Sequence, residues 1–258
     1  MNSPLPKKRK VAIFDVDGTI FRSSLLIELV EVLIEKEIFK ESVRKDYEKE
    51  KVRWLDRKGD YDSYIDAVVK VFTKNIKGVS YKEFLDTSKL VIERYHSRVY
   101  RFTRDLLKEL RKKKYFLLAI SQSPKTILDQ FCGELGFDKV YGRIYELGPS
   151  DRFTGNIVDE HLIANKANIV RRAVEKENLT LEGSLGVGDT EGDISFLELV
   201  EHPVCFNPNM KLYRQGKRLG WNIFVERKNV LYSLGETEKL QNIFDFSAIL
   251  TASSKRVR

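Results

Sequence analysis

The sequence predicts an α/β protein with an open parallel sheet, a small β-hairpin, and an all-helical domain inserted after the first strand. Short apolar runs alternate with helical patterns along the chain, which is typical of parallel strands joined by helices. A long helical stretch with few strand signals separates the first two runs. The 258 residues suffice for one large domain, or for a core that carries a smaller domain.

The expected core strands are four short apolar runs, at residues 11–14, 115–120, 185–188 and 203–206. A helix precedes the second run, because Leu106, Leu107 and Leu110 share one helical face. Residues 143–158 predict the hairpin, with Gly148-Pro149-Ser150-Asp151 as its turn.

The inserted stretch starts with apolar side chains at helical spacing between Leu25 and Ile34, and glutamates occupy the other face. Ser23 or Ser24 suits the N-cap of this helix. Further helical patterns cover residues 47–54, 61–72 and 81–100.

We therefore expect a core of residues 1–21 and 103–258 and an all-helical cap of residues 22–102. A cap over a ligand-binding crevice and a purely structural helical domain both fit the pattern. Four basic or aromatic residues of the cap are candidates to face such a crevice, although solvent exposure fits them equally: Arg53, Trp54, Arg57 and Tyr61.

The composition favours a globular protein with an anionic ligand. Hydrophobic residues make up 42% of the chain, which is enough for a sizeable core. Lys and Arg number 46 and Asp and Glu 38, so the formal charge is 46 − 38 = +8. Acidic residues are interleaved with the basic ones, which indicates a mixed solvated surface and makes nucleic acid an unlikely partner.

The cysteines and histidines predict neither a zinc site nor a disulfide. Cys132 and Cys205 lie far apart in apolar contexts, as buried free thiols of a reducing compartment do. The three histidines have no paired spacing. No apolar run approaches the roughly 20 residues of a membrane span. Pro6-Lys7-Lys8-Arg9-Lys10 resembles a nuclear-localisation patch but also suits a solvated lead-in to the first strand, and we expect a cytoplasmic protein.

Polar clusters follow three of the predicted strands. Asp15 and Asp17 follow the first, Ser121 the second and Asp189 the third. Ligands of open parallel sheets bind outside the carboxyl ends of the strands, so these side chains are expected to meet in one crevice.

Asp15-Val16-Asp17-Gly18-Thr19 has the chemistry of a phosphate and magnesium site. Two neighbouring carboxylates repel each other unless a cation neutralises one or one holds a proton. Mg²⁺ takes such oxygen ligands, and a carboxylate can also attack phosphorus. Gly18 allows a tight turn, so amides near Thr19 could point at phosphate oxygens. Calcium loops and ordinary turns use the same residues, so the motif alone leaves these alternatives open.

The later clusters are individually ambiguous. In Ser121-Gln122-Ser123-Pro124, Ser123 suits the N-cap and Pro124 the first position of a helix whose N-terminus would bind an anion, or would simply be capped. Lys166 opens an amphipathic helix, where a lysine is ordinarily solvated. Asp189 ends a strand and Asp193 lies one turn into the next helix, where the helix dipole alone also favours an acid.

As an ordered set, these motifs resemble the haloacid dehalogenase superfamily, and the helical insertion after the first motif resembles its phosphoserine-phosphatase-like branch. The resemblance implies a Rossmann-like core and a Mg²⁺-dependent phosphatase. Asp15 would be the nucleophile that forms a phospho-aspartate, and Asp17 the acid and base. Ser121, Gln122 and Lys166, with Gly18 and Thr19, would bind the phosphoryl group. Four residues would form the metal site: Asp15, the backbone carbonyl of Asp17, Asp189 and, in support of them or of Lys166, Asp193.

One departure bears on the substrate. Phosphoserine phosphatases have a glutamate for the substrate amine nine positions after the first aspartate, and this chain has Ser24 there. Their second motif commonly continues with glycines, where this chain has Gln122-Ser123-Pro124. We therefore expect hydrolysis of a small, amine-free phosphomonoester rather than phosphoserine. Phosphotransfer through the same intermediate, and a non-catalytic anion- or nucleic-acid-binding protein on the same scaffold, are the alternatives. The sequence leaves the oligomeric state open.

Overall fold

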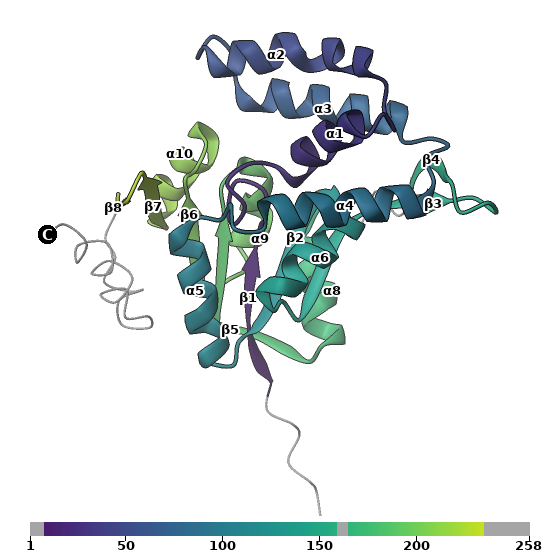
Figure 1. Ribbon diagram of the computed structural model, residues 1–258. Helices are drawn as coiled ribbons and strands as arrows, with labels where there is room; N and C mark the ends of the chain where they lie inside the picture. Colours follow the sequence, from purple (N-terminus) through teal and green to yellow (C-terminus); the bar gives the residue numbers. More distant parts are fainter. Residues whose placement is uncertain (1–7, 159–164, 235–258) are drawn as a thin grey trace, which may run out of the picture.

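The computed structural model describes residues 8–158 and 165–234 (Figure 1). Its described part contains an eight-stranded sheet in the order β4-β3-β2-β1-β5-β6-β7-β8. The strands are β1 (Arg9–Phe14), β2 (Phe116–Pro124), β3 (Lys139–Leu147), β4 (Phe153–Val158), β5 (Leu179–Gly188), β6 (His202–Phe206), β7 (Asn222–Arg227) and β8 (Val230–Ser233).

The sheet is parallel from β3 to β7, and the antiparallel strands β4 and β8 lie at its two edges. The four predicted core strands are confirmed as β1, β2, β5 and β6. The hairpin is confirmed as β3 and β4, and the amide of Asp151 donates to the carbonyl of Gly148 in its turn. Two features were not predicted: β3 begins at Lys139 and joins the sheet beside β2, and β7 and β8 follow β6.

The central strand β1 shows why this sheet is covered on both faces. Its residues Val11 to Phe14 are completely buried. Ala12 and Phe14 belong to the hydrophobic cluster with Leu106 of α5 (Arg101–Lys112) and with α6 (Lys125–Leu135). Val11 and Ile13 belong to the cluster on the other face. That cluster includes residues of α8 (Lys166–Lys176), α9 (Ile194–Leu197) and α10 (Met210–Leu219). The continuous apolar run therefore follows from the alternation of side chains along a doubly covered strand.

The stretch between β1 and α5 is helical, as expected. Its elements are α1 (Leu25–Glu35), the short 3₁₀ helix η1 (Glu41–Arg44), α2 (Lys45–Leu55), α3 (Tyr61–Asn75) and α4 (Tyr81–Tyr95). The hydroxyl of Ser24 accepts from the amide of Leu26, so Ser24 is the N-cap of α1. In Figure 1, α2 and α3 stand away from the sheet, whereas α4 lies beside α6.

The prediction that the last of these helices continues to residue 100 is wrong, because α4 ends at Tyr95. After Tyr95 the backbone pairs with the loop that follows β1. The carbonyl of Arg98 accepts from the amide of Arg22, and the amide of Tyr100 donates to the carbonyl of Ile20. These bonds take the place of the helical hydrogen bonds that a longer α4 would make, and they hold the chain beside the end of β1.

The hairpin is bonded to the segment between α3 and α4. The amide of Gly78 donates to the carbonyl of Phe153 at 2.8 Å, and the amide of Phe153 donates to the carbonyl of Val79 at 3.0 Å. The amide of Tyr81 donates to the carbonyl of Asp151 at 2.8 Å. Three backbone bonds thus join the helical insertion to a strand pair at the edge of the sheet.

The expected helix start, with Ser123 as N-cap and Pro124 as first residue, is wrong by one position. β2 continues through both residues, and α6 begins at Lys125 with Pro124 as its N-cap. The side chain of Ser123 makes no cap bond, because its hydroxyl donates to Asp17. Cys132 and Cys205 are buried free thiols, as predicted. In residues 8–158 and 165–234, no helix is long and apolar enough to cross a membrane.

Candidate active site

Asp15 follows β1 directly, at the centre of the sheet and at the carboxyl end of the strand. The amide of Asp15 donates to the carbonyl of Val187 on β5, so the parallel pairing continues past the end of β1. This places the Asp15 carboxyl group among the ends of the neighbouring strands, where the residue is only 7% exposed. The predicted convergence of strand ends is therefore present at this residue.

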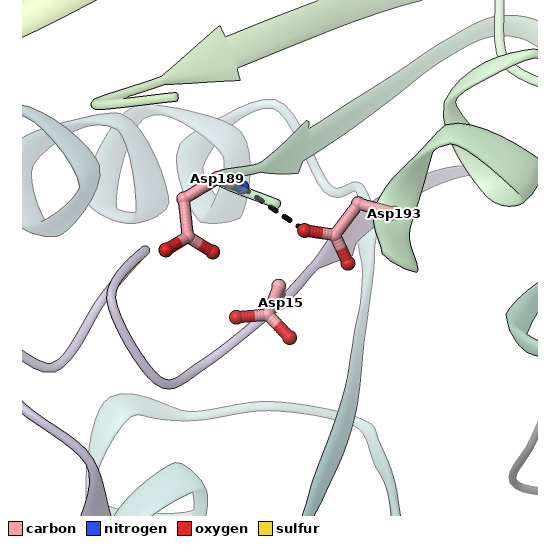
Figure 2. A group of neighbouring side chains, drawn as sticks. All are labelled: Asp15, Asp189 and Asp193. Atoms are coloured by element: carbon pink, nitrogen blue, oxygen red, sulfur yellow. Dashed lines mark hydrogen bonds between the residues drawn. The ribbon is translucent and has the colours of Figure 1, made fainter. Parts of the chain in front are cut away.

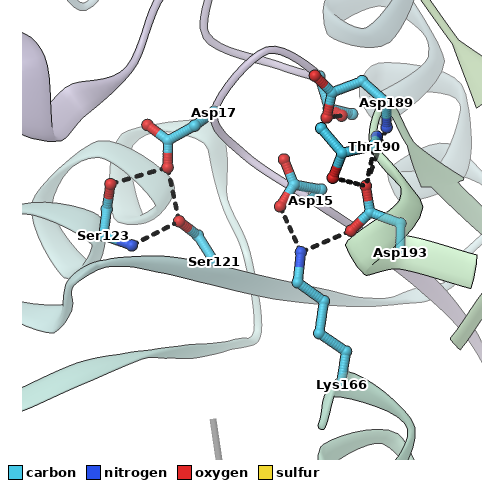
Figure 3. A network of polar contacts seen from close by, with 9 residues as sticks. Asp15, Asp17, Ser121, Ser123, Lys166, Asp189, Thr190 and Asp193 are labelled. Carbon is cyan, nitrogen blue, oxygen red and sulfur yellow. Dashed lines mark hydrogen bonds and ion pairs between the residues drawn. The ribbon is translucent and has the colours of Figure 1, made fainter. Parts of the chain in front are cut away.

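Lys166 reaches this carboxyl group from the first residue of α8. Its Nζ lies 2.5 Å from Oδ1 of Asp15 and 2.6 Å from Oδ1 of Asp193, and Lys166 is 6% exposed (Figure 3). The side chain of Asn165 accepts from the amides of Ala167 and Asn168 and so caps the helix. The cap fixes the start of α8, and with it the position of the lysine.

Asp15, Asp189 and Asp193 form an acidic cluster in which one ligand oxygen from each lies within 4.8 Å of the others (Figure 2). Gly18 has φ +80°, and a Cβ there would lie 2.1 Å from Oδ2 of Asp189. The backbone therefore approaches the Asp189 carboxylate more closely than any other residue type allows. The hydroxyl of Thr19 donates to Oδ1 of Asp189 at 3.1 Å.

Asp193 is held by the turn in which it lies. Its Oδ2 accepts from the amides of Asp189 and Thr190 at 3.0 and 3.1 Å. Thr190 and Asp193 form a capping box around the short 3₁₀ helix η2 (Glu191–Asp193). We had expected Asp193 to lie one turn into the next helix. It lies instead at the end of the 3₁₀ helix η2. One Asp193 oxygen is bound by the backbone and the other by Lys166, so this residue orients the lysine.

The electrostatics of the cluster favour a bound cation. Burial, together with the charges of Asp193 and Asp17, raises the pKa of Asp15 to about 8 against the lowering effect of Lys166. Burial also raises the pKa of Asp189, and the neighbouring carboxylates add to that effect. Burial alone would lower the pKa of Lys166, but Asp15 and Asp193 outweigh it and raise that pKa above its ordinary value. A divalent cation would relieve the repulsion between the carboxylates, so this oxygen donor set fits Mg²⁺.

The carboxyl group of Asp17 faces β2 and α1 instead of the acidic cluster. Its Oδ2 accepts from the hydroxyls of Ser121 and Ser123 at 2.6 and 2.8 Å (Figure 3). Its Oδ1 accepts from the amide of Leu25 at 2.6 Å. Asp17 therefore connects the ends of β1 and β2 to the first residue of the helical insertion. Sequence reasoning missed Ser123 as a site residue, because the serine suited a helix cap.

The other predicted phosphate-binding residues lie in different places. Gln122 and Ser121 line the cavity at the site, together with Asp15, Asp17 and Lys166. The amide of Gly18 donates to the carbonyls of Phe21 and Ser23, and Thr19 is completely buried. In this conformation Gly18 and Thr19 contact the Asp189 carboxylate and are not among the residues that line the cavity.

The cavity has a volume of about 360 Å³, in the range of small-molecule sites. One wall is a face of α3 at helical spacing: Tyr61, Asp62, Ile65, Asp66 and Val69. Of the cap residues that we considered, Tyr61 lines the cavity, whereas Arg53, Trp54 and Arg57 are not among its lining residues. Ser24 lines it beside Asp17, and Arg143 of β3 lines it beside Gln122. The helical spacing of these α3 residues can be read from the sequence, but the sequence does not show that they line the cavity.

Comparisons with known proteins give the family of the chain. A family model described as haloacid dehalogenase-like hydrolase matches residues 12–198. A histidinol-phosphatase of Neisseria meningitidis serogroup C is 24% identical over 220 residues, which are 83% of this chain and 98% of the relative. A phosphoserine phosphatase of Archaeoglobus fulgidus is 24% identical over 209 residues, which are 80% of this chain and 54% of the relative.

Two solved structures have a similar fold. A Bordetella pertussis protein of unknown function superposes with a TM-score of 0.67 at 15% identity, covering 84% of this chain and 98% of that one. A substrate-bound phosphoserine phosphatase superposes with a TM-score of 0.57 at 20% identity, covering 81% and 91%. Since the family model covers well over half of the sequence, the chain belongs to the haloacid dehalogenase-like hydrolase family.

Proposed function

We propose that the protein is a Mg²⁺-dependent phosphomonoester hydrolase that acts through a phospho-aspartate on Asp15. The observation that carries the proposal is the contact of Lys166 with Asp15 and Asp193, 2.5 and 2.6 Å away, beside the acidic cluster. Phosphoryl transfer requires a nucleophile, a cation and metal ligands close together. A carboxylate, a buried lysine and the acidic cluster lie together here at the carboxyl ends of the strands.

Three groups would hold the metal ion: the carboxylates of Asp15 and Asp189 and the backbone carbonyl of Asp17. Asp193 would support this arrangement through its bonds to Lys166 and to the amide of Asp189. The bound Mg²⁺ would neutralise charge on the transferring phosphoryl group and allow Asp15 to approach it as a carboxylate. Gly18 and Thr19 would keep the Asp189 carboxylate in place.

The remaining steps belong to side chains. An oxygen of Asp15 attacks phosphorus as the bond to the leaving oxygen breaks, which gives the phospho-aspartate and an alcohol. Lys166 and Ser121 bind the phosphoryl oxygens and stabilise their charge. Asp17 gives its proton to the leaving oxygen and then takes a proton from the water that hydrolyses the intermediate. The bonds from Ser121, Ser123 and Leu25 set the direction of the Asp17 carboxyl group.

The helical insertion would act as a cap that chooses the substrate. We propose residues 22–102 as this cap and residues 1–21 and 103–258 as the catalytic core. The α3 wall and Ser24 both line the cavity, which supports a role in recognition. Ser24 offers a hydroxyl where phosphoserine phosphatases have a carboxylate, so the proposed substrate is a small phosphomonoester other than phosphoserine.

The test is the hydrolysis of an aryl phosphate by the wild type and by Asp15→Asn, each with Mg²⁺ and with a chelator. We expect release of inorganic phosphate by the wild type with Mg²⁺ only, and a rate at least about 10³-fold lower for Asp15→Asn. Asp129→Asn is a matched control, since Asp129 is an aspartate of α6 that pairs with Lys125 and does not line the cavity. An Asp15→Asn enzyme at full rate would exclude the mechanism. Transfer of phosphate to added alcohols in place of its release would assign a phosphotransferase.

A further inference from the structure

Tyr61 brings a hydroxyl group from the helical insertion to the catalytic cavity. It is the first residue of α3 and lines the cavity together with Asp15, Asp17 and Asp189. Burial, together with the negative charges of these three aspartates, raises the pKa of Tyr61 above its ordinary value. The effect of a charge falls with distance, so the phenol hydroxyl lies near the carboxyl groups at the ends of β1 and β5.

The ring of Tyr61 is held by two aromatic neighbours. Its centroid lies 5.5 Å from that of Trp54 on α2 and 6.3 Å from that of Tyr64, and both contacts are edge-to-face. The guanidinium of Arg57 lies over the Trp54 ring, 5.5 Å from its centroid, and Tyr64 is buried. The side chain of Asp60 caps α3 and fixes the start of the helix. Packing therefore positions the Tyr61 ring within the insertion itself.

The Tyr61 hydroxyl remains available to a ligand. No residue in the ranges 8–158 and 165–234 forms a hydrogen bond with it. The carboxylates near it already have other donors, since Asp17 accepts from two hydroxyls and an amide and Asp189 accepts from Thr19. A phenol with an ordinary pKa of about 10 is protonated at neutral pH, and negative charges around it favour that form. Tyr61 is thus a neutral hydrogen-bond donor in the cavity.

The position of the hydroxyl indicates which part of a substrate it meets. Among the charged groups around Tyr61, Asp17 and Asp189 have the largest effects on its pKa. In the proposed mechanism Asp17 faces the leaving oxygen and Asp189 is a metal ligand, so a phosphoryl group on Asp15 would lie between them. A hydroxyl near both carboxylates therefore faces the phosphoryl group. Its oxygens accept hydrogen bonds and carry the charge of the transition state.

We infer, on the basis of the function proposed above, that the hydroxyl of Tyr61 donates a hydrogen bond to a phosphoryl oxygen of the substrate. The phosphoryl group then receives donors from two sides, from Lys166 and Ser121 in the core and from Tyr61 in the insertion. Tyr61 is a catalytic residue in this arrangement, and the helical insertion completes the catalytic centre in addition to choosing the substrate.

Tyr61→Phe tests this role, because it removes the hydroxyl and keeps the ring. With Mg²⁺, we expect kcat/KM for an aryl phosphate and for n-pentyl phosphate to fall by the same factor, at least about tenfold, since the two esters share the phosphoryl group. The inhibition constant of orthovanadate, a phosphate analogue without a leaving group, should rise at least about fivefold.

Tyr81→Phe is the matched control. Tyr81 is the first residue of α4, packs edge-to-face on Phe153 at 6.1 Å, and is not among the residues that line the catalytic cavity. We expect its kcat/KM values to stay within about twofold of the wild type. Both variants should melt within about 2 °C of the wild type, because neither loses a ring contact.

Three results would overturn the inference. One is a Tyr61→Phe enzyme whose kcat/KM values stay within about twofold of the wild type. Another is a fall confined to one of the two esters, which would place Tyr61 on the leaving group. The third is an unchanged inhibition constant of orthovanadate. In each case hydrolysis of the aryl phosphate that depends on Asp15 would leave the proposed function intact.

Calorimetry with inorganic phosphate tests the contact without turnover. It is measured with Mg²⁺ on the Asp15→Asn protein, which lacks the nucleophile. We expect Tyr61→Phe in this background to weaken phosphate binding at least about fivefold, and Tyr81→Phe to leave it unchanged. Equal phosphate affinities with and without the Tyr61 hydroxyl would refute the inference even if no ester were hydrolysed.

Discussion

Nζ of Lys166 lies 2.5 Å from Oδ1 of Asp15, and both side chains are buried although 151 positions separate them in the sequence. The pair joins the end of β1 to the beginning of α8. Asp193 contacts the same Nζ from the other side, so one buried cation faces two carboxylates. Such an excess of negative charge is costly unless another cation is bound, which relates the ion pair to the proposed metal site.

Replacing Lys166 with Met should abolish most of the activity. The variant loses the cation that would stabilise the phosphoryl oxygens, and we expect kcat for an aryl phosphate to fall at least about 10²-fold at saturating Mg²⁺. Lys139→Met is the control, because Lys139 pairs with Glu177 at 3.4 Å on the surface. A rate within about twofold of the wild type would remove Lys166 from the mechanism.

Metal-free protein should become less stable as the pH rises from about 4 to about 8. The pKa of Asp15 is near 4 in an unfolded chain and is raised to about 8 in the folded protein, mainly by burial. The folded state therefore holds more protons than the unfolded state within this window, and the free energy of unfolding falls with increasing pH. Thermal melts in the presence of a chelator, across the same window, measure this slope.

Mg²⁺ should reverse this loss of stability at higher pH, since it binds the ionised carboxylates. We expect Mg²⁺ to raise Tm more at about pH 8 than at about pH 6. Asp15→Asn has no charge to bury, so its metal-free Tm at about pH 8 should exceed that of the wild type by a few degrees. If Mg²⁺ raised Tm equally at the two pH values, the acidic cluster would not be the metal site.

The sequence predicted those parts of the site that depend on strand ends. Asp15, Ser121 and Asp189 each follow a buried apolar run, and parallel strands bring such positions to one edge. Lys166 was placed there only by the resemblance to a family, since a lysine at a helix start is ordinarily solvated. The structure supplies its physical basis, which is the cap by Asn165 and the two carboxylates around Nζ.

Positions that depend on tertiary packing could not be predicted. The α3 face that holds Asp62 and Asp66 has clear helical spacing, but only the packing of the insertion directs it to the cavity. Arg143 belonged to an expected hairpin, and nothing in the local pattern shows that β3 also pairs with β2. Ser123 suited a helix cap because Pro124 follows it, whereas the pairing of Pro124 with Arg143 keeps this segment in the sheet.

Gly18→Ala should weaken metal binding without unfolding the protein. The new Cβ would lie 2.1 Å from Oδ2 of Asp189 at a backbone φ of +80°, so the Asp189 carboxylate must move. We expect the Mg²⁺ concentration for half-maximal activity to rise at least about tenfold. Gly133→Ala is the control, since no atom lies within 4 Å of its added Cβ and Ala favours the helix. Unchanged Mg²⁺ dependence in Gly18→Ala would contradict the placement of Asp189 in the metal site.

Replacing Ser121 and replacing Ser123 should have different effects on kcat and KM, although both hydroxyls donate to Oδ2 of Asp17. Ser121 is proposed to turn its hydroxyl from Asp17 to a phosphoryl oxygen when the substrate binds, so Ser121→Ala should raise KM and lower kcat for an aryl phosphate. Ser123→Ala removes only a bond that orients Asp17, so it should lower kcat by about tenfold and change KM little. Steady-state kinetics at saturating Mg²⁺ measure both values. If the two variants raised KM equally, Ser121 would have no role at the phosphoryl group beyond that of Ser123, and orientation of Asp17 would explain both residues.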